Sequence, residues 1–332
     1  MVANQRKLSI ALLVAFGFTG EAGAISVGAD FSSYTVTELG GIAGLPTNYG
    51  GLTFKAGDPH TIIIGGAANG ASGRFYEVGV TRDGNNQING FGTPTLIGGL
   101  GEFNDGGIAY GPGGVLFTSR WPANELGQTK PGSTDEDKII DLAALGVAGS
   151  HAALNFVPAG FAGAGQFKLV SWSGGQWYTA TLGPDGSGTF DVLGVMQEDL
   201  DLVAIGIQNV PGGPEGFVYI DGVNPGFGVD SLLIAEYSAG KVGAYDLDAN
   251  GNPLVSTRRD FLTGLSGAEG SAIDPLTNDF IFSTFGGGSH LVRVSGFIAP
   301  PPPPPGAGVP VPATIALLGV GFLGLAASKR RR

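Results

Sequence analysis

Short runs of alternating apolar and polar residues recur between Ile25 and Ile298, separated by turns rich in Gly, Pro and Asp. Alternation with a period of two is typical of a half-buried β-strand, and a tight turn between two such runs predicts an antiparallel pair. Five units share this order of strand, turn and strand. They begin at Tyr49, Asp105, His151, Glu215 and Glu269.

Two further strands are expected in each unit. Segments such as GQWYTATLGPDGSGTFDVLGV (Gly175–Val195) contain an aromatic strand, an Asp-Gly or Asn-Gly turn and a second strand. These dipeptides readily adopt the positive φ that tight hairpin turns require. Four strands per unit, with units starting 46 to 64 residues apart, are typical of propeller blades. The sequence therefore predicts an all-β fold, a five-bladed β-propeller.

The fifth unit lacks a fourth strand, because the proline tract begins soon after HLVRVSGF (His290–Phe297). The segment Asp30–Leu39 alternates like a strand and precedes the first unit. We expect it to pair with the last unit and close the ring, which removes open sheet edges. A six-bladed ring is the alternative if residues 119–138 or 190–214 contain additional strands.

One of these strand–turn–strand segments also resembles known repeats. GIAYGPGGVLFTS (Gly107–Ser119) is similar to repeats of NHL, streptogramin-lyase-like and gluconolactonase-like propellers. The resemblance implies a propeller fold for residues 25–298. It assigns no activity, because unrelated functions share this fold.

The start of the chain predicts export. Arg6 and Lys7 precede the apolar run Leu8–Phe18, and the small residues Ala22 and Ala24 follow. This order is typical of a secretory signal peptide, which we expect to occupy residues 1–24.

The end of the chain predicts a membrane segment. A Pro/Gly-rich linker covers residues 299–308, and the nineteen residues 309–327 are nearly all apolar. That length is just sufficient for a transmembrane helix, and the basic residues that follow would stay on the cytoplasmic side.

Residues 309–332 also resemble the PEP-CTERM sorting signal of Gram-negative bacteria. The resemblance rests on a V-P-V-P-A-T box, a Gly-containing apolar segment and a terminal arginine cluster, matched by Pro310, Pro312, Ala313, Thr314, Arg330, Arg331 and Arg332. Val311 departs from the usual Glu. The resemblance implies an exosortase-type membrane protease as partner and delivery to the cell surface or extracellular matrix. A plain C-terminal anchor is the alternative.

Charge and cysteine content exclude some functions. Between the two terminal segments, eleven cations face 27 acidic residues, a net charge of −16. An acidic surface repels phosphate, so nucleic acid is not expected as a partner. The chain has no cysteine, which excludes thiol catalysis and cysteine-based zinc sites.

Candidate ligand-binding residues stand at the start of the five units. Alignment places Tyr49, Asp105, His151, Glu215 and Glu269 just before the innermost strands, at one mouth of the expected channel. Carboxylates that meet there would suit Ca²⁺ or Mg²⁺, with Asp105, His151, Glu215 and Glu269 as ligands. The gluconolactonase-like resemblance likewise implies Glu215 and Glu269. The alternative is that these acids cap turns by accepting backbone N–H bonds.

A second calcium candidate is DLDANGN, in which Asp246, Asp248, Asn250 and Asn252 alternate. An EF-hand loop requires an acid at its twelfth position, where this chain has Thr257. A hairpin turn is the alternative.

Trp121 begins the longest expected insertion, residues 119–138, and is a candidate binding residue, because loops on a rigid scaffold often carry recognition. The three histidines lack the context of a nucleophilic triad. Two functions follow from these features. The first is a surface-sorted propeller that binds exopolysaccharide or other matrix components without catalysis. The second is a metal-dependent hydrolase, lactonase or lyase that acts at the channel mouth.

Overall fold

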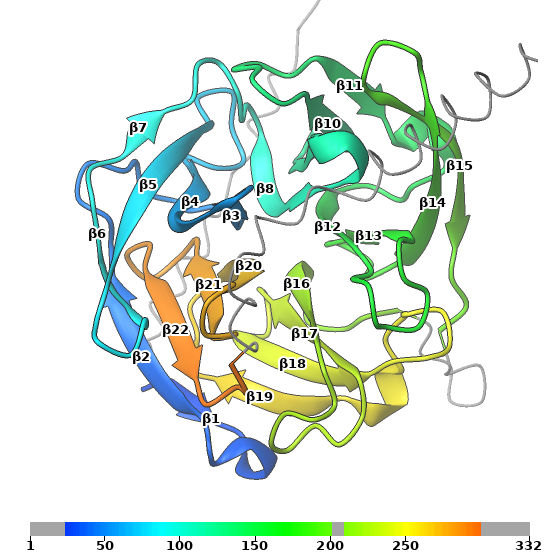
Figure 1. Cartoon of the computed structure of the whole chain (residues 1–332). Helices are drawn as coiled ribbons and strands as arrows, with labels where there is room; N and C mark the ends of the chain where they lie inside the picture. The colour runs from blue at the N-terminus through cyan, green and yellow to red at the C-terminus, as the bar shows by residue number, and fades with distance from the viewer. Residues whose placement is uncertain (1–23, 201–208, 300–332) are drawn as a thin grey trace, which may run out of the picture.

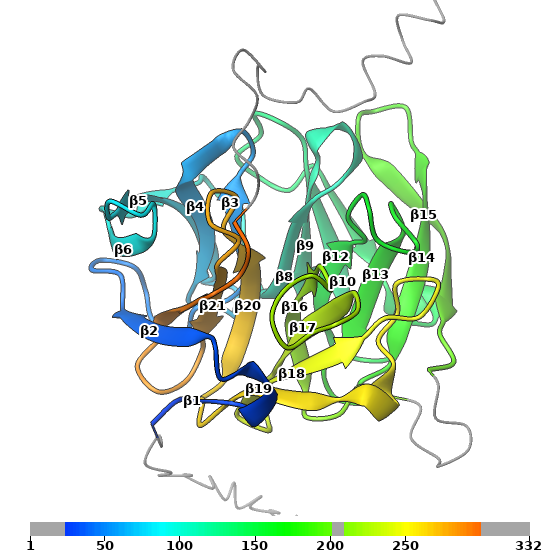
Figure 2. The same cartoon turned by 60° about the horizontal axis from the view of Figure 1, so that its bottom comes forward.

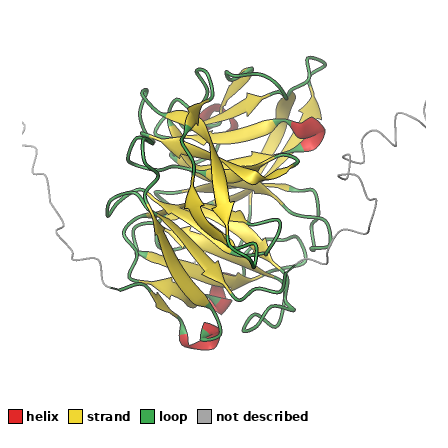
Figure 3. Ribbon diagram, turned by 60° about the vertical axis from the view of Figure 1, so that its left-hand side comes forward, coloured by secondary structure: helices red, strands yellow, loops and turns green. Residues whose placement is uncertain are grey.

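The computed structural model describes residues 24–200 and 209–299. Five antiparallel sheets surround a common centre like the blades of a propeller (Figure 1). The described helices are single 3₁₀ turns at the periphery (Figure 3), namely η1 (Ala29–Phe31), η2 (Pro112–Gly114), η3 (Ala143–Leu145) and η4 (Val255–Thr257). The prediction of an all-β, five-bladed propeller is confirmed.

Each blade is built from consecutive strands, with the first one innermost. Blade 1 contains β3 (Leu52–Lys55), β4 (Asp58–Gly66), β5 (Arg74–Arg82), β6 (Ile88–Phe91) and the short β7 (Thr95–Leu96). Blade 2 contains β8 (Asn104–Tyr110), β9 (Leu116–Arg120), β10 (Glu125–Thr129) and β11 (Lys138–Asp141). Blade 3 contains β12 (His151–Phe156), β13 (Phe167–Ser171), β14 (Trp177–Pro184) and β15 (Phe190–Gln197). Blade 4 contains β16 (Pro214–Ile220), β17 (Ser231–Glu236), β18 (Lys241–Asp246) and β19 (Arg259–Thr263). Blade 5 contains β20 (Ala268–Ile273), β21 (Phe280–Thr284) and β22 (Leu291–Ser295).

The N-terminal segment completes the last two blades. Strand β2 (Thr35–Gly40) pairs antiparallel with β22, with Val36 opposite Val294. Strand β1 (Ser26–Val27) pairs with β19 of blade 4, and Figure 2 shows both strands along the outside of the ring. The predicted closure by Asp30–Leu39 is therefore confirmed, and the same segment also extends blade 4.

The six-bladed alternative is wrong, because residues 119–138 contain regular strands of blade 2. They include the end of β9, all of β10 and the start of β11. The prediction that residues 119–138 form a long insertion is therefore wrong. Residues 190–197 form β15, and residues 201–208 lie outside the described part of the chain.

The core is divided among the contacts between neighbouring blades. Five clusters of buried apolar side chains occur, one between each adjacent pair of blades, including blades 5 and 1. Near the axis, glycines allow the inner strands to approach closely. A Cβ on Gly216 would lie 2.6 Å from the Ser271 nitrogen, and one on Gly270 would lie 2.5 Å from the Gly51 Cα. The channel is therefore narrow where the inner strands begin.

The predicted signal peptide, linker and membrane helix lie almost entirely outside the described residues. Within residues 24–200 and 209–299, no helix is long and apolar enough to cross a membrane.

Candidate functional site

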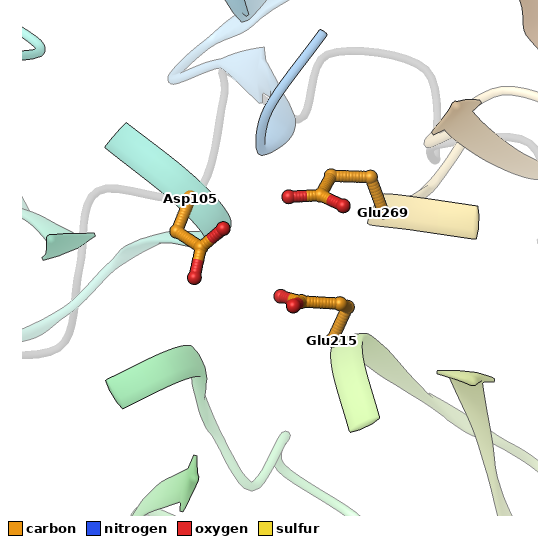
Figure 4. Close-up of side chains that lie close together, drawn as sticks. All are labelled: Asp105, Glu215 and Glu269. Atoms are coloured by element: carbon orange, nitrogen blue, oxygen red, sulfur yellow. The ribbon is translucent and has the colours of Figure 1, made fainter. Parts of the chain in front are cut away.

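Three carboxylates converge where the inner strands begin. Asp105, Glu215 and Glu269 are the second residues of β8, β16 and β20, and one oxygen of each lies within 4.8 Å of the others. Figure 4 shows the three side chains pointing toward one another from three blades. Their exposed fractions are only 1%, 4% and 1%. We call these residues the carboxylate cluster.

A backbone feature repeated in every blade sets this convergence. One residue with positive φ precedes each inner strand, and its carbonyl accepts the N–H of a residue just after the second strand. The five pairs are Asn48 with Ala68, Phe103 with Trp121, Ser150 with Trp172, Gly213 with Tyr237, and Gly267 with Phe285. Two residues beyond the positive-φ position stand Gly50, Asp105, Ala152, Glu215 and Glu269. Three of the five equivalent positions therefore carry an acid.

This register explains why His151 does not join the cluster. His151 is the first residue of β12 and pairs with Ser171, as Asn104 of blade 2 pairs with Arg120. It thus precedes the acid position by one residue, and such a shift turns a strand side chain to the opposite face. Its Nδ1 lies 3.1 Å from the Glu125 carbonyl oxygen, and burial lowers the pKa of His151 to about 4.

Tyr49 is displaced by the same one-residue shift. Its hydroxyl accepts the Ile42 N–H at 2.8 Å, away from the cluster. The sequence alignment of the five units was therefore correct for three units and one residue out of register for two.

Burial dominates the electrostatics of the carboxylate cluster. It raises the pKa of Asp105 to about 7, partly offset by a side-chain hydrogen bond with Glu269. Burial, and then repulsion between the acids, raise the pKa values of Glu215 and Glu269 well above their usual range. Apart from the contact between Asp105 and Glu269, Asp105 Oδ2, Glu215 Oε2 and both Glu269 oxygens have no well-aligned hydrogen-bond partner among the described residues. The backbone N–H of Gly106 lowers the pKa values of Asp105 and Glu215 but does not offset their burial.

The carboxylate cluster opens into a pocket of about 240 Å³, which we call the mouth pocket. Glu215, Glu269 and Asn69 line it together with four aromatic residues, Trp121, Trp172, Tyr237 and Phe285. We call these four residues the aromatic arc. With its amide nitrogen facing the cluster, Asn69 donates to Asp105 Oδ1 at 2.9 Å.

Trp121 therefore lines a pocket, although it does so directly after β9 and not on an insertion. Trp172 follows β13 and lines the same pocket. Trp177 is fully buried in β14. Sequence reasoning missed Tyr237 and Phe285, whose only signal is an aromatic residue directly after the second strand of a blade.

The oxygens of the DLDANGN segment are engaged within the protein. Asp248 accepts the backbone N–H groups of Asn250 and Asn252. Asn252 Oδ1 accepts the Lys168 ammonium at 2.6 Å, and Asp246 pairs with Arg259 at 3.2 Å. A lysine ammonium beside these oxygens repels a cation, and the local structure is a hairpin turn after β18.

The opposite mouth of the channel contains a larger cavity of about 490 Å³, lined by the ends of the inner strands and by Phe297. Phe297, nearly the last described residue, therefore lies at this second mouth. The carboxylate cluster lies at the other one.

Comparison with known proteins identifies the C-terminal segment. Residues 308–332 match the sequence model of the PEP-CTERM protein-sorting motif. The chain therefore carries the sorting signal that Pro310, Pro312, Ala313, Thr314 and Arg330 to Arg332 predicted, although these residues lie outside the described structure. The signal marks an exported protein that is sorted to the cell surface of a Gram-negative bacterium and is transiently anchored in the membrane. It implies processing by an exosortase, a membrane protease.

Distant likeness to solved structures also exists. Glutaminyl cyclase from Myxococcus xanthus is 12% identical with a TM-score of 0.47, covering 80% of this chain and 97% of that chain. The PQQ-bound aldose sugar dehydrogenase from Streptomyces coelicolor is 14% identical with a TM-score of 0.37, covering 78% and 84%. An auxiliary nutrient binding protein from Bacteroides ovatus is 11% identical with a TM-score of 0.42, covering 79% and 76%. Such distant likeness carries no functional argument. No curated protein matches the sequence.

Proposed function

We propose that this protein is a cell-surface binding protein that takes a positively charged ligand from the extracellular matrix into the mouth pocket. The observation that carries the proposal is the carboxylate cluster, whose buried oxygens lack well-aligned hydrogen-bond partners among the described residues. Buried charges of one sign are costly unless a partner neutralises them. Burial therefore favours the protonated acids, as their raised pKa values indicate, and a cation that enters from the pocket favours their ionised form and is bound by it.

The position of the pocket supports this role. Phe297, near the end of the described chain, lies at the second mouth, and the sorting motif comes later in the sequence, at residues 308–332. The carboxylate cluster lies at the other mouth. A binding site at this mouth is free to meet components outside the cell, of which exopolysaccharide is our primary candidate.

The second candidate is a metal-dependent hydrolase, lactonase or lyase. One specific observation favours this candidate: three carboxylate oxygens lie within 4.8 Å of one another. Ca²⁺ prefers such oxygen ligands. Asp105, Glu215 and Glu269 would hold the ion, which would polarise a substrate oxygen when bound.

The test of the proposed function uses the purified full chain and exopolysaccharide extracted from the producing bacterium. We expect the polysaccharide to retain the wild-type chain, and Trp172→Ala to lose most of this retention while the domain stays folded. Glu38→Gln, an exposed acid on β2, serves as the control and should bind like wild type. Failure of the wild-type chain to bind overturns the proposal.

The enzyme alternative is tested by metal analysis and by melting in Ca²⁺ and in chelator. A ligand that binds only the folded state must raise its stability. If the purified protein contains no metal and its melting temperature is the same with Ca²⁺ and with chelator, the main support for a metal-dependent enzyme is removed. Lactone hydrolysis that depends on Ca²⁺ and is lost in Glu269→Gln would favour the enzyme over the binding protein.

A further inference from the structure

The aromatic arc repeats the symmetry of the propeller. Its four residues come from four successive blades, and each directly follows the second strand of its blade. Neighbouring ring planes are inclined by 78°, 77° and 72°, close to the one-fifth turn, about 72°, that relates adjacent blades of a five-bladed ring. All four rings line the mouth pocket. We call the space between them the aromatic shaft.

The spacing of the rings sets the width of this shaft. Neighbouring centroids are 6.4, 6.3 and 6.1 Å apart. Points separated by about 6.3 Å and one fifth of a turn lie about 5.3 Å from the axis. That is within the roughly 6 Å at which a cation is attracted to an aromatic ring. In blade 1 the equivalent position holds the small residue Ala68, which leaves one side of the shaft without a ring.

The carboxylate cluster lies in the same space. Glu215 and Glu269 line the pocket with the rings. The pKa of Tyr237 is raised by burial and further by the negative charges of Glu269, Glu215 and Asp105. Two independent features therefore meet at one point, an aromatic shaft and a group of buried, unpartnered carboxylate oxygens.

We propose that the mouth pocket binds a primary ammonium group, with the nitrogen on the carboxylate cluster and the carbon skeleton between the aromatic rings. This inference rests on the proposed function and names the chemistry of its ligand. An R–NH₃⁺ group offers three N–H donors, which can reach the oxygens of Glu215 and Glu269 that line the pocket. Hydrogen bonds between ionised groups are roughly twice as strong as neutral ones.

Other cations match the pocket less well. A quaternary ammonium suits the rings but has no N–H to donate, so the carboxylate oxygens would stay unpartnered. Ca²⁺ takes six to eight oxygen ligands, and the aromatic arc supplies little oxygen. A neutral sugar stacks on the rings but brings no positive charge to the carboxylate cluster.

The experiment titrates the purified full chain, in chelator at neutral pH, and follows tryptophan fluorescence and calorimetric heat. The probes are D-glucosamine, butylamine, N-acetyl-D-glucosamine and choline. We expect glucosamine or butylamine to bind at least tenfold more tightly than N-acetylglucosamine or choline. Tighter binding of glucosamine than of butylamine would identify an amino sugar as the source, and the reverse would identify an alkylamine.

Four variants separate binding from folding. Glu269→Gln keeps the shape of the side chain and should weaken glucosamine binding at least tenfold. Trp172→Ala should weaken it several-fold, with partial recovery in Trp172→Phe. Glu38→Gln is the matched control and should bind like wild type, and each variant is compared only after its cooperative melting is verified.

Several outcomes would overturn the inference. They are equal binding of glucosamine and N-acetylglucosamine, unchanged affinity in Glu269→Gln, or saturable Ca²⁺ binding with no binding of either amine. If the chain retains exopolysaccharide but neither glucosamine nor butylamine binds or competes, the proposed function stands and the ammonium assignment falls. If neither polysaccharide nor amine binds, both fall.

Discussion

At the residue scale, two glycines lie against two rings of the aromatic arc, Trp172 and Tyr237. Gly213 and Gly267 have φ values of 71° and 65°, and residues other than glycine rarely adopt such positive φ values. A Cβ at Gly213 would lie 2.8 Å from Trp172 Nε1, and one at Gly267 would lie 2.8 Å from Tyr237 Cε2. Each ring therefore rests on the backbone of the next blade, which holds it in place at the pocket.

The carboxylate cluster predicts an inverted pH dependence of stability. Burial raises the pKa of folded Asp105 from 3.8 to about 7, so between these pH values the folded chain binds more protons than the unfolded chain. Stability due to this group therefore falls as pH rises through that range. We expect Asp105→Asn in chelator to melt several degrees above wild type at pH 8, and the difference to vanish near pH 4.

The comparison between variant and wild type isolates this effect. Buried His151 acts in the opposite sense, since its lowered pKa removes stability as pH falls from about 6.5 to about 4. It is present in both proteins and cancels. The control Glu38→Gln should shift melting little at either pH. A larger gain at pH 4 than at pH 8 would contradict the assigned pKa direction.

At the scale of elements, a buried ion pair joins the first blade to the last. Arg82, at the end of β5, donates to both carboxylate oxygens of Asp274, which follows β20, at 2.6 and 3.1 Å. The two side chains are 6% and 0% exposed. The pair thus links blades 1 and 5 in addition to the chain segment that runs from β2 to β3.

Removing one partner of this pair should be costly. Arg82→Ala leaves a buried carboxylate without its counter-charge, and we expect a loss of about 3–5 kcal/mol of unfolding free energy, measured by urea denaturation. The exposed pair Lys55–Glu77 provides the comparison, because Lys55→Ala should cost less than about 1 kcal/mol. Similar losses in both variants would show that burial does not govern the energy of the Arg82 pair.

At the scale of the whole molecule, the N-terminal segment holds the ring closed. Besides β1 and β2, it contributes Phe31 and Tyr34 to the core between blades 4 and 5. The Phe31 ring centroid lies 5.0 Å from those of both Phe227 and Phe261. Pairing and packing thus act together at the outside of these two blades.

Deleting residues 25–40 should therefore abolish cooperative unfolding and cause aggregation, because the edge of β22 becomes open and apolar surface is exposed. Circular dichroism during heating and size-exclusion chromatography measure both effects. The milder variant Phe31→Ala should cost about 3–5 kcal/mol. A chain that begins at Ile25 is the control and should melt like the full chain. Unchanged melting after the 25–40 deletion would show that the ring closes without this segment.

Much of the fold was predictable because its causes are local. Alternation, Asp-Gly turns and the missing fourth strand after His290–Phe297 indicated four-stranded units, their number and the closure by Asp30–Leu39. Residues 119–138 were misread, because polar strand residues such as Gln128 and Thr129 look like loop residues when their buried partners are unknown.

The sequence by itself determined the repeating strands, the acids that begin three inner strands and the C-terminal sorting signal, since each depends on residues that are close along the chain. Only the tertiary structure decided which side chains share the channel mouth. A one-residue difference in register excludes His151 and Tyr49, and the one-fifth turn between blades brings Tyr237 and Phe285 beside Trp121 and Trp172. The register of the inner strands and the rotation between blades arise from contacts between distant strands, so a local pattern of residues does not predict them.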